Sequence, residues 1–258
     1  MSTKHSMPQL INMKFIEKAN LPDSMISVAA ISCQAGEAIK KLNSIGIHTI
    51  EIPCSKYLPK PINSHADLQI LHFGNNDIFC HQEHLFIGEL YENVNLKIIN
   101  EAPGNKYPQD VRLNGIVIGD KFICNKRTIS KNVLEFAEQN GFTIINTNQG
   151  YSKCSICVVD ENSIITDDES VFSAIGNFLN DALLISKGSI GLKGYNYGFI
   201  GGCCGKISKD ILAVNGLIES HSDYKKIIDF LDKHSVRCLE LTDKPLEDIG
   251  GILPLIEK

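Results

Sequence analysis

Residues 107–146, YPQDVRLNGIVIGDKFICNKRTISKNVLEFAEQNGFTIIN, contain the pattern that decides the fold. Two short apolar runs, GIVIG and KFICN, meet at a Gly-Asp turn, which indicates a tight hairpin of two strands. Helical periodicity follows in ISKNVLEFAEQNG, where Ser130 is placed to cap the first turn. The run FTIIN then predicts a third strand. The stretch therefore predicts one module with the order strand, strand, helix, strand.

The same order of elements recurs along the chain. Further copies are found in residues 65–82, 150–186 and 194–241. The last segment, residues 247–258, supplies a single strand, which the N-terminal runs 24–33 and 36–53 would complete. Five units at spacings of roughly 40–50 residues are what a closed ring of such modules needs. Because no Ser/Gly-rich linker interrupts the pattern, we expect α/β architecture in a single domain over residues 1–258.

Composition narrows the class of protein further. The 258 residues are 43% hydrophobic and carry a formal net charge of −5, with Lys and Arg spread along the chain. This mild acidity argues against general binding to nucleic acid or to anionic membranes. The N-terminal residues lack the basic and apolar regions of an export signal, and no long apolar run predicts a transmembrane helix. We therefore expect a cytoplasmic protein.

Nine cysteines are scattered along the chain, and most are expected to be small buried residues rather than disulfide partners. Cys154 and Cys157 have the spacing of a redox or zinc pair, but the run KCSICVVD predicts a strand, which would point the two side chains to opposite faces. Cys203 and Cys204 lie in a predicted Gly-rich turn. The His-Gln-Glu-His segment at 81–84 is predicted to be a solvated loop rather than a metal site. No metal and no organic cofactor is expected.

On these motifs the chain resembles the guanidino-modifying, or pentein, superfamily, which includes arginine and agmatine deiminases, dimethylarginine dimethylaminohydrolases and amidinotransferases. Residues 119–128, GDKFICNKRT, are similar to the second-module hairpin of the dimethylarginine hydrolases, and residues 66–78 are similar to their first-module strand. The resemblance implies a five-bladed, pseudo-symmetric α/β propeller of ββαβ modules around a narrow channel. It also implies that Asp67, the acid that leads the first-module strand, holds a guanidinium group.

Two segments alternate polar with apolar residues, and strand parity would place their polar side chains on one face, toward the channel. These side chains are His65, Asp67 and Gln69 in one segment and Asp110, Arg112 and Asn114 in the other. A carboxylate fixed in the channel can accept two parallel hydrogen bonds from a planar guanidinium. For Asp67 this binding role and a structural role are weighed equally. For Asp110 an ion pair with Arg112 is favoured.

The chain departs from the resembled enzymes at the three positions that carry their chemistry. Those enzymes use a cysteine in the last module, a histidine that opens the third module and an acid in the second. Here the last strand has Pro254, or a neighbour within one or two residues, at the position of the cysteine, and no cysteine follows Cys238. The third module opens with Tyr151, Ser152 and Lys153, without a histidine, and the acid position falls at Asn114. The resemblance therefore implies a branch of the superfamily without the usual catalytic triad.

Three hypotheses remain open at this stage. In the first, the chain is a hydrolase or deiminase whose catalytic residues occupy other positions, with Cys154 as the thiol and His65 as the base. The substrate would then be bound by Asp67, Asp110, Arg112 and Asn114. In the second, it binds a small cationic guanidino or amine compound without turning it over. In the third, it is an interaction module for a macromolecule, by analogy of fold alone. The sequence leaves the oligomeric state open.

Overall fold

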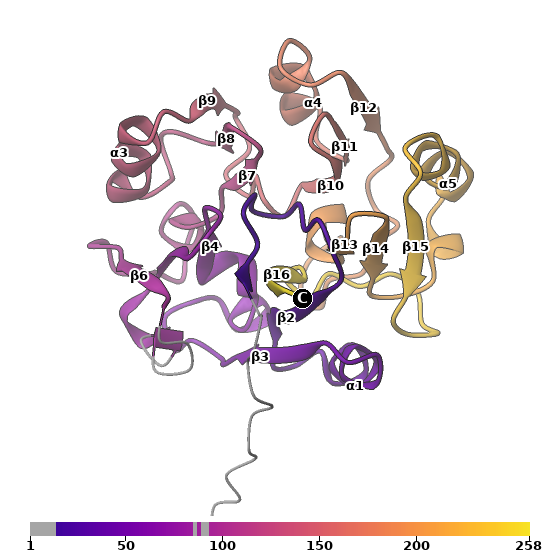
Figure 1. Cartoon of the computed structure of the whole chain (residues 1–258), viewed down its shortest axis with the longest axis horizontal. Coiled ribbons are helices and arrows are strands. Elements are labelled where there is room, and N and C mark those ends of the chain that lie inside the picture. Colours follow the sequence, from indigo (N-terminus) through magenta and orange to yellow (C-terminus); the bar gives the residue numbers. More distant parts are fainter. Residues whose placement is uncertain (1–13, 85–86, 89–92) are drawn as a thin grey trace, which may run out of the picture.

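The computed structural model describes residues 14–84, 87–88 and 93–258. The first residues, on which the expectation about an export signal depends, lie outside these ranges. The described residues form five separate sheets that stand around a central axis, with the helices α1, α3, α4 and α5 on the outside (Figure 1). The predicted five-bladed α/β propeller is thereby confirmed. No helix in the described ranges is long and apolar enough to cross a membrane.

Four of the sheets repeat one pattern of three strands, in which an antiparallel hairpin is followed by a parallel third strand. The first contains β4 (Ile70–His72), β5 (Asp77–Cys80) and β6 (Asn95–Ile98). The second contains β7 (Ile116–Ile118), β8 (Lys121–Cys124), α3 (Lys131–Gln139) and β9 (Thr143–Asn146). The third contains β10 (Ile156–Asp160), β11 (Ser163–Thr166), α4 (Glu169–Ile175) and β12 (Asp181–Leu184). The fourth contains β13 (Cys204–Ser208), β14 (Ile211–Val214), α5 (Tyr224–Lys233) and β15 (Arg237–Glu240).

The fifth sheet joins the two ends of the chain, as the sequence predicts. Its order is β1 (Lys14–Phe15), β16 (Leu253–Glu257), β2 (Ile26–Ser32) and β3 (His48–Ile52), with α1 (Gly36–Ser44) between β2 and β3. β16 pairs antiparallel with β2, and β2 pairs parallel with β3. The last strand β16 therefore closes the ring by pairing with the N-terminal strand β2 in the fifth sheet.

The apolar core lies between neighbouring sheets. One cluster joins Ile118 and Ile123 of the β7–β9 sheet to Ile156 and Ile164 of the β10–β12 sheet, beneath Val171 of α4. A second cluster lies between the β10–β12 and β13–β15 sheets and is covered by α5. Since burial of apolar surface is the main stabilising term, these shared clusters hold the sheets at fixed positions around the axis.

Short 3-10 helices lie in several of the connections. They are η1 (Lys60–Ile62), η2 (Ala66–Leu68), η3 (Gln82–His84), η4 (Gln109–Val111), η5 (Ile200–Gly202) and η6 (Ile218–Ser220). Two of them directly precede inner strands, η2 before β4 and η5 before β13. Each such helix turns the chain toward the axis before the strand begins.

The prediction of a solvated loop at residues 81–84 is wrong for the two histidines, although Gln82 and Glu83 between them are exposed. His81 is only 3% exposed and His84 is fully buried, and Nε2 of His84 lies 2.8 Å from Oε1 of Gln69. The sequence pattern could not reveal this burial, because the residues that cover the segment come from distant parts of the chain. Burial, followed by the nearby His84, lowers the pKa of His81 to about 4.

This burial makes the stability of the protein depend on pH. A histidine whose pKa is lower in the folded state binds protons preferentially when unfolded, so stability falls as the pH drops from about 6.5 toward about 4. We expect His81 to account for about 2 kcal/mol of lost unfolding free energy between pH 7.5 and pH 5. Urea unfolding at both pH values should therefore show a smaller pH effect in His81→Gln.

The matched control is the exposed His48, whose replacement by Gln should leave the pH effect unchanged. An identical loss of stability on acidification in the wild type and in His81→Gln would contradict the assignment to His81.

Candidate functional site

The segments that lead into the inner strands of all five modules meet at the axis. Asp67 lies in η2, Asn114 follows η4, Cys154 lies in the turn before β10, Gly202 ends η5, and Asp248 lies shortly before β16. These residues are far apart in the sequence, and they become neighbours because the modules are arranged in a ring. The convergence point is therefore a property of the fold as a whole.

Hydrogen bonds run around this ring from one module to the next. The amide of Asn114 donates to the carbonyl oxygen of Asp67 at 2.9 Å and to Sγ of Cys154 at 3.1 Å. The N–H of Gly202 donates to the carbonyl of Cys154 at 3.1 Å, and the N–H of Ile249 donates to the carbonyl of Gly202 at 2.9 Å. The circle closes where the N–H of Asp67 donates to the carbonyl of Gly250 at 3.1 Å. Because these contacts are fixed by backbone and amide groups, the side chains on the ring are held in place.

Two buried carboxylates belong to this ring. Oδ2 of Asp67 accepts a hydrogen bond from the Cys154 thiol at 3.0 Å, while its Oδ1 has no hydrogen-bond partner among the described residues. Asp248 accepts hydrogen bonds from the N–H groups of Phe199 at 3.0 Å and Gly250 at 2.9 Å. Nδ1 of His65 lies 3.6 Å from Oδ1 of Asp248. The ring therefore brings two buried carboxyl groups close to each other, and Asp67 adds to the raised pKa of Asp248.

A cavity of about 240 Å³ opens over this point. Its walls are mostly aromatic and apolar, and its polar lining includes His65, Cys154, Asn196 and Asp248. The apolar and aromatic lining residues are Ile62, Leu68, Tyr151, Leu192, Tyr195, Tyr197 and Phe199. The cavity thus combines aromatic walls with one acidic group, the carboxyl group of Asp248.

The aromatic walls are ordered by contacts among themselves. The rings of Tyr151 and Phe199 are stacked with centroids 6.0 Å apart, and Tyr197 meets Phe199 edge-on at 5.9 Å. The hydroxyl of Tyr151 donates to Oδ2 of Asp110 at 2.6 Å. Burial, and next this hydrogen bond, raise the pKa of Tyr151, so the phenol stays protonated. Asp110 therefore positions a cavity wall.

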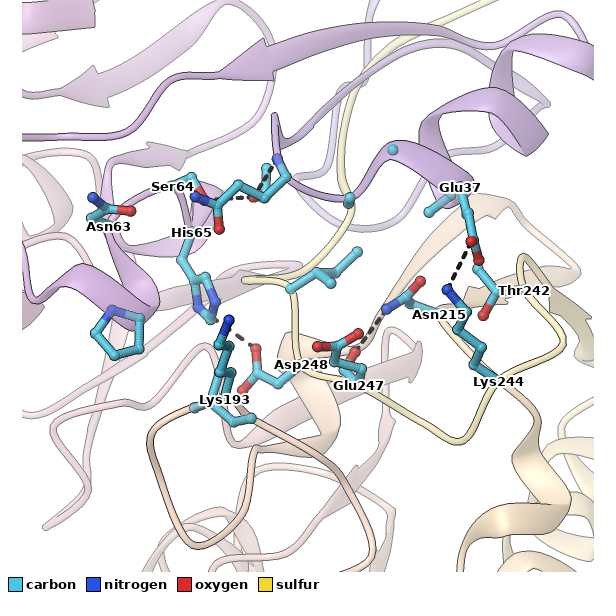
Figure 2. A pocket seen from close by; sticks show the side chains of 18 of the residues that line it. Glu37, Asn63, Ser64, His65, Lys193, Asn215, Thr242, Lys244, Glu247 and Asp248 are labelled. Atoms are coloured by element: carbon cyan, nitrogen blue, oxygen red, sulfur yellow. Dashed lines mark hydrogen bonds and ion pairs between the residues drawn. The ribbon is translucent and has the colours of Figure 1, made fainter.

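A larger cleft of about 920 Å³ adjoins the cavity and shares His65, Leu192 and Asp248 with it. Figure 2 shows this cleft, with His65 facing Asp248 and with Lys244 paired with Glu37. The cleft carries charges of both signs, whereas the cavity is lined by aromatic groups and an acid. The His65–Asp248 pair stands where the two spaces meet.

Burial sets the protonation states at the base of the cavity. Burial, followed by the charges of Asp67 and Asp248, raises the pKa of the Cys154 thiol well above its usual value. Burial likewise raises the pKa of Asp248; His65 opposes this shift and Asp67 adds to it. Cys154 is therefore a protonated thiol that donates to Asp67 at neutral pH. Lys153 lines a separate small cavity, where its ammonium group donates to the carbonyl of Gly201 at 3.0 Å.

The prediction that strand parity places the polar side chains of residues 65–69 and 110–114 on one face is wrong for both segments. Asp67 lies in the 3-10 helix η2, with β4 beginning only at Ile70, and Asp110 lies in η4, with β7 beginning at Ile116. Side chains of a 3-10 helix repeat about every three residues rather than every two. The alternation of polar and apolar residues therefore does not mean that the polar side chains lie on the same face.

The favoured pairing of Asp110 with Arg112 is also replaced by other contacts. Asp110 accepts from Tyr151, and Arg112 donates to the carbonyl of Thr128 at 3.1 Å, near the charge of Glu101. Similarly, Cys154 lies in a turn and not in the predicted strand, which begins at Ile156. That turn is what brings its sulfur to the axis.

The structure thus brings together most of the site residues that the sequence singles out. His65 and Cys154 line the cavity. Asp67 and Asn114 form hydrogen bonds with the Cys154 side chain. Asp110 accepts a hydrogen bond from Tyr151, which forms part of the cavity wall. Arg112 instead donates a hydrogen bond to the carbonyl of Thr128, away from these residues. Their chemical roles stay predictions.

Sequence reasoning missed the aromatic wall and the role of Asp248. The segment 195–199, Tyr-Asn-Tyr-Gly-Phe, holds three aromatic residues in a chain that is only 7% aromatic, and this density was the available signal. Asp248 carries no such signal, because its place is fixed by the glycines that follow it. Both Gly250 and Gly251 have φ of +78°, which lets the chain turn sharply from Asp248 into β16.

In the ranges that the structure describes, no group of three or more His, Cys, Asp or Glu side chains is arranged to hold a metal ion. That the protein works without metal or organic cofactor remains a prediction.

Comparisons with known proteins agree with the architecture. Residues 30–253 match the sequence model described as Family of unknown function (DUF6873). No curated protein matches the chain significantly. DDAH from Pseudomonas aeruginosa, in complex with citrulline, is similar in structure with a TM-score of 0.56, at 10% identity over 88% of this chain and 96% of that chain. Inosamine-phosphate amidinotransferase from Streptomyces griseus has a TM-score of 0.56 at 11% identity, over 93% of this chain and 97% of that one.

A third similar structure is the agmatine deiminase of C. jejuni, with a TM-score of 0.54 at 10% identity over 92% of both chains. At such low identity these similarities establish a shared fold.

Proposed function

We infer that this chain, which belongs to the Family of unknown function (DUF6873) and has the fold of the guanidino-modifying (pentein) superfamily, binds a small organic cation in its axial cavity. The observation that carries the proposal is the combination of aromatic walls with the buried carboxyl group of Asp248 in one cavity. The faces of Tyr151, Tyr195 and Phe199 attract a cation through their quadrupoles. Asp248 and, behind Cys154, Asp67 supply the opposite charge.

The size and chemistry of the cavity favour an amine or a guanidine. Its volume of about 240 Å³ is below the range of about 300–1,000 Å³ that is usual for drug-sized ligands. A planar guanidinium can stack on an aromatic face and donate to a carboxylate at the same time. The similar structures include an agmatine deiminase and a DDAH bound to citrulline, which makes guanidino compounds the first class to test.

Binding without turnover is favoured over thiol catalysis. A nucleophilic cysteine must lose its proton, and the surroundings of Cys154 raise its pKa instead. At the position aligned with the superfamily's nucleophile the chain has Pro254, which lies in β16 and pairs with Ala29.

A relocated hydrolase is the second candidate. The observation in its favour is that Cys154 and His65 line the same cavity, with Asp67 in contact with the thiol. Asp67, Asp110, Arg112 and Asn114 would then assist substrate binding, as the sequence suggested. This candidate predicts ammonia or amine release from the bound compound, which the experiment below also measures.

A thermal-shift screen tests the proposal. A cation with a millimolar Kd, added at about ten times that concentration, should stabilise the folded protein by about 1.4 kcal/mol, which shifts Tm by a few degrees in a chain of this size. We expect agmatine or arginine to raise Tm, whereas citrulline, which replaces the guanidinium of arginine by a neutral urea group, should not.

Equal shifts with arginine and citrulline, or no shift with any amine or guanidine, would contradict binding of a cation. Ammonia or amine released from a compound that raises Tm, and lost in Cys154→Ala, would replace the binding proposal by the hydrolase.

The proposal also includes the class of ligand and the cellular compartment. A net charge of −5 supports a small cation, rather than nucleic acid, as the ligand. All nine cysteines are free, and a cysteine-rich chain without disulfides fits the reducing cytoplasm.

A further inference from the structure

Two cysteines follow neighbouring parallel strands at the rim of the large cleft. Cys33 comes directly after β2, and Cys54 comes two residues after β3. The two strands are in register, with Ser32 opposite Ile52, and the N–H of Cys33 continues the ladder by donating to the carbonyl of Ile52 at 3.1 Å. Both strands end at this point, and the thiol of Cys33 interacts with the thiol of Cys54. Neighbouring thiols at the ends of paired strands can form a disulfide when their side chains approach each other.

The surroundings of the two thiols differ from those of most other cysteines in the chain. Cys54 is exposed and lines the cleft, and its sulfur accepts a hydrogen bond from the amide of Gln34 at 3.2 Å. Cys33 is partly exposed, and its thiol interacts with that of Cys54, which adds to the effect of burial in raising the pKa of Cys33. Cys80, Cys124, Cys154, Cys157, Cys203 and Cys204 are buried and Cys238 is partly exposed.

We propose that Cys33 and Cys54 are a site of reversible oxidation, at which a low-molecular-weight disulfide converts the two thiols into an intramolecular disulfide. The accessible Cys54 reacts first, because attack by an oxidant requires an exposed sulfur. Cys33 then resolves the intermediate, since it is the neighbouring thiol.

The chemistry is balanced when the oxidant is a small disulfide. The thiolate of Cys54 attacks one sulfur of the oxidant, its S–S bond breaks, and one thiol leaves with a proton. The thiolate of Cys33 then attacks Sγ of Cys54 in the mixed disulfide, and the second small thiol leaves. Two protein thiols are oxidised, one disulfide is reduced to two thiols, and the same reagents in reverse restore the protein.

The position of the pair gives the modification a structural consequence. Cys33 begins the turn that leads into α1, and Cys54 begins the connection that leads to Ser64 and His65. These two segments already touch where Oγ of Ser32 and Oγ of Ser64 lie 2.7 Å apart. A disulfide would therefore fasten both sides of one wall of the cleft next to the proposed binding site.

Mass spectrometry of the full-length chain tests this assignment. The reduced protein is treated with excess oxidised glutathione and the remaining thiols are blocked with N-ethylmaleimide before digestion with trypsin. Lys40 and Lys41 lie between the two cysteines, so trypsin places them in separate peptides. We expect most of the protein to lose two hydrogens and yield a Cys33–Cys54 linked peptide, which dithiothreitol separates again.

In the variant Cys33→Ser, the same treatment should instead leave glutathione on Cys54. A wild-type protein that keeps a stable glutathione adduct on Cys54, forms a disulfide at other cysteines, or shows both thiols unreacted would overturn the assignment. Because no ligand is present in this experiment, its outcome is independent of the proposed binding function.

Discussion

Replacement of Gly205 by alanine is expected to destabilise the protein by more than about 3 kcal/mol, among the largest effects of any single added methyl group. Gly205 lies in β13, where this strand passes against the chain just before β16. A Cβ atom at this position would collide with the carbonyl oxygen of Ile252. The contact is made by backbone, which cannot move aside as a flexible side chain can. The N–H of Ile252 also donates to the carbonyl of Cys204 at 3.2 Å, so separation of the two segments would break a contact that closes the ring.

Urea unfolding at neutral pH measures this effect. The matched control is Gly36→Ala at the first position of α1, where an added Cβ would have no atom within 4 Å. We expect that control to leave stability unchanged or to raise it slightly, because alanine favours the helix. Equal stabilities for Gly205→Ala and Gly36→Ala would mean that the close approach of β13 to the closing segment is incorrect.

The variant Asp67→Asn is expected to weaken binding of the cation without lowering the free energy of unfolding. Asp67 is 1% exposed and raises the pKa of both Cys154 and Asp248, which means that its negative charge repels charge on these neighbours. Its removal should leave the free energy of unfolding unchanged or slightly higher. A cation in the cavity would lose the attraction of a desolvated carboxylate, and we expect its Kd to rise at least about tenfold, or about 1.4 kcal/mol.

Titration calorimetry with the compound that gives the largest thermal shift provides the Kd. The control is Glu257→Gln, which neutralises another buried carboxylate, in β16, whose Oε2 accepts from the N–H groups of Asp23 and Ser24. Its affinity for the cation should equal that of the wild type. An unchanged Kd in Asp67→Asn, or an equal loss in both variants, would show that Asp67 does not act on the ligand.

The fold could be predicted from the sequence because its signals are local. The Gly-Asp turn at 119–120, the periodicity of residues 131–139 and the recurrence of the same order elsewhere each depend on neighbours in the chain. Closure of the ring by residues 253–257 follows from the count of strands, since an unpaired last strand needs a partner.

The site was only partly predictable, because its geometry depends on irregular segments. The sequence pattern places Asp67, Asn114 and Cys154 within predicted strands, but their mutual contacts come from 3-10 helices and turns that alternation patterns cannot distinguish from strands. The role of Asp248 depends on two glycines with positive φ and on the distant Phe199. The protonation states of Cys154 and Asp248 cannot be predicted from the sequence either, since they depend on burial.

The most direct test of the central claim is a crystal structure of the chain with the bound cation of highest affinity. Our account predicts electron density in the cavity of about 240 Å³, with the charged group between the faces of Tyr195 and Phe199 and within hydrogen-bond distance of Asp248. A cation located instead in the large cleft beside Glu37 and Glu247, with the aromatic cavity empty, would contradict it.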